Sequence, residues 1–116
     1  MKKLILLISI IVLSSCGTQQ KGIENKKVTA VKNQRGDLVG FANKESFQQA
    51  PYKTWFTQKF NTYEPNQSTI APLTKNLKGI KIKGFMGTWC GDSKRETPHF
   101  YKILEQTGFN LNNFQL

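Results

Sequence analysis

Hydrophobic and polar positions divide this chain into four stretches. An apolar run covers residues 4–13, and a polar stretch without periodicity covers residues 17–27. From residue 28 to 78, short β-prone and aromatic groups are separated by turn-forming residues. The last stretch, residues 79–116, begins with a strand-like run and continues with apolar positions at helical spacing. These periodicities predict a hairpin, several short helices, and then a strand–helix–strand segment.

Within residues 28–78, turn-forming and helix-capping residues indicate where the expected elements begin and end. Residues 28–31 and 38–41 are β-prone and flank a turn-rich pentapeptide, which predicts a hairpin. Asn43 can cap a short helix that carries Phe47. A longer helix is expected after Pro51 and should stop at residues 64–67. A further short helix is expected over residues 72–77.

The helix that Pro51 opens has an aromatic face. Its apolar side chains recur at spacings of three and four residues: Tyr52, Trp55, Phe56, Phe60 and Tyr63. Such a stripe favours a core-facing helix, and the alternative is a ligand-binding surface.

Residues 80–109 contain the single cysteine outside the N-terminal segment. Apolar residues over 80–86 predict a buried strand, and a helical pattern starts at Gly91. This order places Cys90 at a helix N-terminus, where unpaired N–H groups favour an anion and lower a thiol pKa. Lys94 and Arg95 are expected to add to this effect. The alternative is that Cys90 is a small buried apolar residue.

The cysteine segment resembles the active-site segment of the thioredoxin-like family, which carries Trp-Cys-Gly-Pro-Cys-Lys between a core strand and a helix. The matching positions here are Trp89, Cys90, Gly91, Lys94, the helix proline Pro98 and the strand residue Phe85. The resemblance implies an α/β, thioredoxin-like fold and thiol–disulfide exchange. Its implied site consists of Cys90 as the nucleophile with Trp89 and Ser93 beside it.

Three positions depart from the family pattern. Ser93 stands where the family has its resolving cysteine, Asp92 replaces the intervening proline, and Gly84 replaces a buried carboxylate. The dithiol has therefore become a monothiol, and Asp92 should oppose ionisation of the thiol.

The resemblance covers about 30 residues. Residues 110–116 can add a strand with Phe114 and Leu116 on one face, but the family's cis-proline loop and closing elements have no counterpart. We therefore expect an incomplete thioredoxin-like fold, truncated at the C-terminus. Residues 79–116 would form its first β-α-β part, behind an N-terminal hairpin and helical extension over residues 28–78.

The N-terminus has the layout of a secretory signal, with Lys2 and Lys3 before the apolar run. The sequence Leu-Ser-Ser-Cys at 13–16 resembles the lipobox of bacterial lipoproteins. This implies a signal peptide over 1–15, a lipid thioether on Cys16, and a flexible tether over 16–27. The alternative is an ordinary signal peptide cleaved near residue 15.

The chain is basic, with 17 Lys and Arg against 7 Asp and Glu, a formal charge of +10. Removing Lys2 and Lys3 would leave 15 basic against 7 acidic side chains, about +8. The basic residues are spread along the chain, and export separates the protein from nucleic acid, so we expect no nucleic-acid partner. A solvated surface with a weak attraction to anionic membranes is expected instead.

His99 is the only histidine. It could act as a base for the thiol, but nine residues of helix correspond to about 13 Å, so we expect a solvated histidine. Two cysteines, one of them lipidated, and one histidine predict neither a metal nor another cofactor.

Two functions remain open from the sequence. The first is an envelope lipoprotein whose Cys90 forms mixed disulfides with cysteine-containing envelope proteins or an external thiol reductant. The second is a redox-inactive binding or structural lipoprotein built on the same fold.

Overall fold

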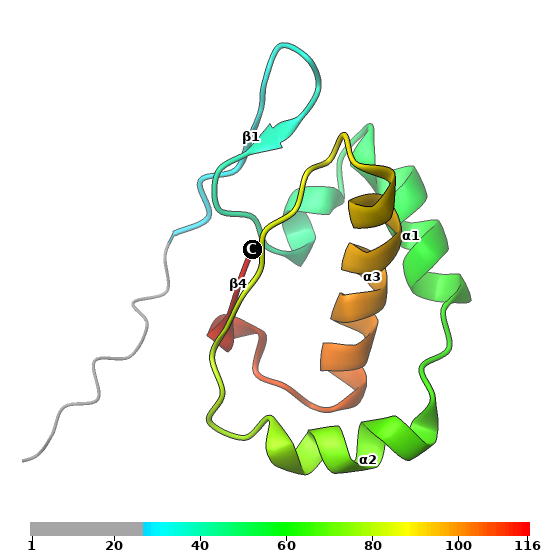
Figure 1. Cartoon of the computed structure of the whole chain (residues 1–116). Helices are drawn as coiled ribbons and strands as arrows, with labels where there is room; N and C mark the ends of the chain where they lie inside the picture. The colour runs from blue at the N-terminus through cyan, green and yellow to red at the C-terminus, as the bar shows by residue number, and fades with distance from the viewer. Residues whose placement is uncertain (1–26) are drawn as a thin grey trace, which may run out of the picture.

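The computed structural model describes residues 27–116, which form a mixed α/β arrangement of three α-helices and two two-stranded sheets. Helices α1 and α3 lie side by side, and α2 runs along the lower edge of the molecule (Figure 1). The predicted signal peptide, Cys16 and nearly all of the tether lie outside the described residues. Within residues 27–116, no helix is long and apolar enough to cross a membrane.

The predicted hairpin is confirmed, with β1 at Val31–Lys32 and β2 at Leu38–Val39 paired antiparallel. Its turn is held by the side chain of Asn33, whose Oδ1 accepts the backbone N–H groups of Arg35 and Asp37 at 2.9 Å each. The strands are shorter than predicted. Gly40 has a φ of 115°, and a Cβ there would lie 2.8 Å from the Thr29 carbonyl oxygen, so regular strand geometry ends at this glycine.

The aromatic face of the second helix forms the core, as predicted. A short 3₁₀ helix, η1 (Lys44–Phe47), begins with an Asn43 capping box, and α1 spans Tyr52–Thr62. Four buried side chains make up the core cluster: Phe47, Tyr52, Phe56 and Tyr101. Since Tyr101 comes from α3, this core joins the N-terminal elements to the cysteine-bearing segment.

The predicted stop after the aromatic helix is confirmed, because α1 ends at Thr62 and residues 63–66 have no regular secondary structure. The start predicted for the following helix was wrong, since α2 spans Gln67–Asn76 and has Pro72 in its interior. Asn66 is its cap, with Oδ1 accepting the Ser68 N–H at 3.0 Å. An asparagine that follows a proline can end one helix and cap the next. The buried side chain of Ile70 anchors α2 to the rest of the protein.

The cysteine segment has the strand–helix–strand order that the sequence predicted. Strand β3 (Ile82–Lys83) leads to α3 (Gly91–Gln106), and a 3₁₀ turn, η2 (Leu111–Asn113), leads to β4 (Phe114–Gln115). β3 and β4 are parallel, with Ile82 opposite Phe114. Pro98 lies inside α3 and is buried there.

The buried strand expected over residues 80–86 is not found. β3 has two residues, and the Ile80 and Phe85 side chains are 45% and 90% exposed. Among residues 27–116, β4 is the only strand paired with β3. Apolar side chains beside such a narrow sheet have few neighbours to cover them, which explains their exposure.

Candidate functional site

Cys90 is the N-cap residue of α3, as the sequence predicted, and its side chain is partly exposed. Its backbone N–H donates to the Gly87 carbonyl at 3.0 Å, which closes a tight turn over residues 87–90. Its own carbonyl accepts the Lys94 N–H at 3.0 Å and so begins the helix. The sulfur is thereby held where α3 presents its unpaired N–H groups.

This position lowers the pKa of the Cys90 thiol. The main cause is the backbone N–H of Ser93, followed by the Ser93 hydroxyl and the Asp92 backbone N–H, which favour the charged form of the sulfur by proximity, without a regular side-chain cap hydrogen bond. Partial burial and the Asp92 carboxylate act in the opposite direction and are outweighed. The expectation that Asp92 opposes ionisation is confirmed, and the thiolate is favoured nevertheless.

The predicted help from Lys94 and Arg95 is not found, since neither contributes to the lowered thiol pKa. The Arg95 guanidinium lies 3.0 Å from Asp92 and also pairs with Glu96. Its charge therefore compensates two neighbouring carboxylates and is not directed at the sulfur.

Ser93 interacts with the first and the last residue of the turn, Gly87 and Cys90. Its Oγ accepts the Gly87 N–H at 3.2 Å, and its hydroxyl stabilises the Cys90 thiolate. Because an hydroxyl can accept one hydrogen bond while donating another, Ser93 serves both neighbours at once. Among residues 27–116, Cys90 is the only cysteine, so this part of the chain supplies no second thiol for exchange.

Trp89 is 74% exposed beside the cysteine. Its indole lies close to Gly87, where a Cβ would be 2.7 Å from Cε2 and Nε1 of the ring. The absence of a side chain at residue 87 thus allows the indole to cover the turn.

Gly84 occupies a crowded position. A Cβ there would lie 2.9 Å from Cδ1 of Leu116 and 3.1 Å from the Phe114 ring. This confirms that Phe114 and Leu116 share a face, and it shows that a carboxylate at residue 84 would displace both.

His99 is not the solvated residue that was expected. Its side chain is 19% exposed, its ring stacks on Tyr63 at 4.1 Å, and its Nδ1 lies 3.7 Å from a Glu96 oxygen. The C-terminal end of α1 packs against α3, which covers the imidazole.

Sequence reasoning missed two residues near the cysteine, Thr88 and Asp37. Thr88 is 5% exposed, and its Oγ1 accepts the Leu38 N–H at 3.0 Å and lies 3.4 Å from the Asp37 carboxylate. These contacts tie the β1–β2 hairpin to the turn that carries Cys90. They join residues about 50 positions apart, so no local pattern could have indicated them.

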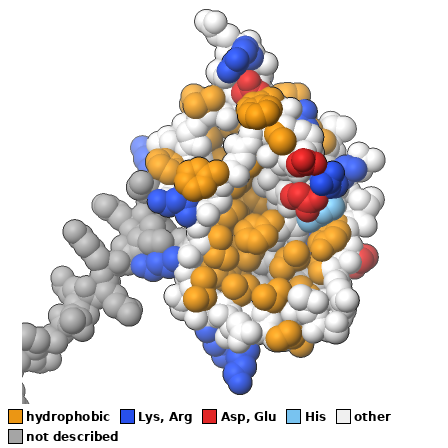
Figure 2. Space-filling model, in the orientation of Figure 1, with side chains coloured by type: hydrophobic (Ala, Val, Ile, Leu, Met, Phe, Trp, Pro, Cys, Tyr) orange, Lys and Arg blue, Asp and Glu red, His pale blue; other side chains and the backbone are white. Residues whose placement is uncertain are grey.

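An apolar surface lies between β4 and α3, with charged and histidine side chains along one margin (Figure 2). It surrounds a hollow of about 320 Å³ lined mainly by apolar side chains, including Ile82, Phe85, Phe100, Ile103, Phe114 and Leu116.

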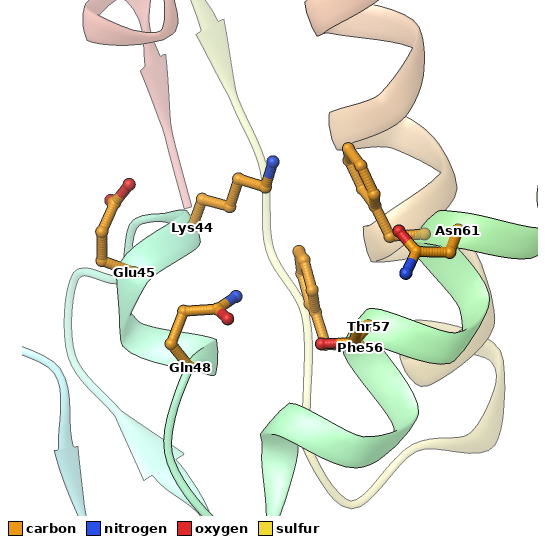
Figure 3. Close-up of a pocket in the computed structure, with 7 residues that line it drawn as sticks. Lys44, Glu45, Gln48, Phe56, Thr57 and Asn61 are labelled. Atoms are coloured by element: carbon orange, nitrogen blue, oxygen red, sulfur yellow. The ribbon is translucent and has the colours of Figure 1, made fainter.

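A second hollow, of about 330 Å³, lies between η1 and α1. Lys44 and Gln48 extend toward it from one side, opposite Phe56 and Asn61 (Figure 3). The Lys44 ammonium is paired with Glu105 and lies 4.0 Å from the centre of the Phe60 ring. This lysine therefore acts as a link between η1, α1 and α3.

Within residues 27–116, no group of three or more His, Cys, Asp or Glu side chains is placed to hold a metal ion. Comparisons with protein-family models, with curated proteins and with solved structures gave no match.

Proposed function

We propose that this protein is a thioredoxin-like thiol–disulfide exchange protein of the bacterial envelope, with Cys90 as its nucleophile. The observation that carries the proposal is the position of Cys90 as the N-cap of α3, with its thiol pKa lowered by Ser93 and the Asp92 backbone. Thiolates are the reactive form of cysteine, and low-pKa, partly exposed cysteines are typical of redox sites.

The chemistry follows from a single thiol. The Cys90 thiolate attacks one sulfur of a partner's disulfide, a new sulfur–sulfur bond forms, and the partner's second sulfur leaves as a thiolate. An external thiolate then attacks the partner's sulfur in the mixed disulfide, forms a new disulfide with it and releases Cys90 as a thiolate. Ser93 stabilises the attacking thiolate but cannot resolve the intermediate, because it has no sulfur.

The envelope location rests on the sequence of the N-terminus. Cleavage before Cys16 and lipidation of its sulfur would hold the protein on a membrane surface, with the tether allowing it to reach partners. Cysteine-containing envelope proteins and small thiol reductants are the proposed partners. Protein disulfides, the proposed substrates, persist in the oxidising compartments to which proteins are exported.

The test is the pH dependence of alkylation of Cys90 by iodoacetamide in the full chain. The tryptic peptide covering residues 84–94 contains Cys90 and no other cysteine, so mass spectrometry can follow it separately from Cys16. Rapid alkylation near pH 6 is expected. Alkylation that becomes appreciable only above pH 8 would favour the second function.

That second function is a redox-inactive binding or structural lipoprotein. It is favoured by the apolar surface between β4 and α3 and by Gly84, which takes the place of the family's carboxylate. Such a protein would need no activated thiol, so the alkylation profile separates the two functions.

A further inference from the structure

We propose that Thr88 is a positioning residue for Cys90, because its hydroxyl fastens the cysteine-bearing turn to the β1–β2 hairpin. This inference rests on the proposed function, since it concerns the reactivity of the same thiol. It assigns the hairpin a role in the site that neither its sequence nor its distance along the chain would suggest.

The first step is the chemistry of Thr88 itself. The residue is buried, and its hydroxyl accepts the Leu38 N–H at 3.0 Å. The same oxygen lies 3.4 Å from Oδ1 of Asp37, to which the hydroxyl proton is directed. Both capacities of the hydroxyl are therefore used on the hairpin, and a buried hydroxyl without partners would be costly.

The second step is the short distance along the chain from Thr88 to the sulfur. The turn over residues 87–90 is closed by the Cys90 N–H and the Gly87 carbonyl, and Gly87 also donates to Ser93. Thr88 lies inside this turn, so its attachment restrains both Gly87 and Cys90. This attachment adds a long-range contact to the local hydrogen bonds among residues 87–94.

The third step is that the hairpin is a firm support. Tyr52, a fully buried core residue, donates from its hydroxyl to the Gly36 carbonyl at 2.7 Å. Asn33 fixes the backbone of the same loop. A continuous set of contacts therefore leads from the core through the hairpin and Thr88 to the turn that carries Cys90.

The consequence concerns the reactivity of the thiol. The thiolate is stabilised by short-range donors from Ser93 and the Asp92 backbone. Such contacts weaken steeply as geometry degrades, so a turn that is free to move will stabilise the thiolate less. The charged groups near this end of the site, Asp37, Asp92 and Arg95, are unchanged by substitution of Thr88.

The test compares Thr88→Val with Thr88→Ser in the full chain. Valine keeps the size of the side chain and removes its hydroxyl, and serine keeps the hydroxyl. We expect Thr88→Val to slow iodoacetamide alkylation of Cys90 at pH 6.5 by about three- to tenfold, and Thr88→Ser to stay within about twofold of the parent protein. At pH 10, where the thiol is ionised in every variant, the rates should converge.

Thr107→Val is the matched control. Thr107 is equally buried, at 5% exposure, and its hydroxyl donates to the Leu104 carbonyl at 2.8 Å at the other end of α3. This variant should lose similar stability and leave the alkylation rate unchanged. If Thr88→Val is unfolded by circular dichroism, Asp37→Ala replaces it, since it removes the acceptor on the hairpin, and a rate reduced by about two- to threefold is expected.

Two results would contradict the inference. One is a Thr88→Val protein that is folded and reacts at the parental rate at pH 6.5. The other is an equal loss of rate in Thr107→Val, which would indicate a general effect of stability. A parent protein with an ordinary thiol profile would instead refute the proposed function, so the two failures are distinguishable.

Discussion

Replacing Phe56 with alanine tests whether the aromatic face of α1 is the core of the protein. Phe56 is 1% exposed and stacks on Phe47, with ring centroids 5.0 Å apart and planes inclined by 11°. It also meets Tyr101 of α3 edge-on at 5.8 Å. Its loss would therefore remove the aromatic contacts through which α1 packs against η1 and α3.

The size of the effect follows from these contacts. Truncation of a buried phenylalanine to alanine costs about 3–5 kcal/mol, and Phe56 makes several aromatic contacts, so we expect about 4 kcal/mol. Typical stability per residue gives roughly 5–13 kcal/mol for a domain of about 90 residues. The variant should retain at most a small part of its stability if the parent lies at the lower end of this range.

The assay is urea unfolding of the full chain followed by circular dichroism. An m-value of about 2 kcal/mol per molar urea converts the expected loss into a midpoint lowered by about 2 M. Phe85→Ala is the control, because Phe85 is 90% exposed, and its effect should stay below about 0.5 kcal/mol. Midpoints for the two variants within about 0.5 M of each other would refute the core assignment and revive the ligand-surface interpretation.

Three further predictions concern the two cysteines and Ser93. Ser93→Ala removes the hydroxyl that stabilises the thiolate, so the thiol pKa should rise and the midpoint of the alkylation profile should move to higher pH; an unchanged midpoint would mean that the hydroxyl does not reach the sulfur. Ser93→Cys should form an internal disulfide with Cys90, because residues three apart across a helix N-terminus are expected to lie within disulfide range. Two free thiols in mass spectrometry of the oxidised variant would contradict this. Cys16→Ser should move the protein from the membrane fraction to the soluble or unprocessed pool, and a processed variant that remains membrane-bound after a high-salt wash would rule out lipid attachment at Cys16.

The sequence predicted the elements that are specified by contacts between residues close together in the chain. The Asn33 turn, the Asn43 cap and the aromatic spacing of α1 specify the hairpin, η1 and the core face through contacts within a few residues. The placement of Cys90 at the start of α3 belongs to the same class, since a strand, a glycine-containing loop and a helical pattern are enough to define it.

Features that depend on distant partners were not predictable. The exposure of Phe85 is determined by how many strands flank β3, and the covering of His99 by where α1 ends. The contact between Thr88 and the hairpin joins residues 50 positions apart, and the Tyr52 hydroxyl ties the same hairpin to α1. Asn66 shows why the start of α2 was misplaced, because the same residue can follow one helix and cap the next.

The most direct test of the central claim is whether Cys90 forms a mixed disulfide. The full chain is incubated with oxidised glutathione at pH 6.5, and the peptide covering residues 84–94 is analysed by mass spectrometry. We predict a glutathione adduct on Cys90 that persists until an external thiol is added and then disappears, because Ser93 cannot resolve it. A folded protein whose Cys90 remains unmodified under these conditions, while a denatured sample at pH 9 is modified, would contradict the claim.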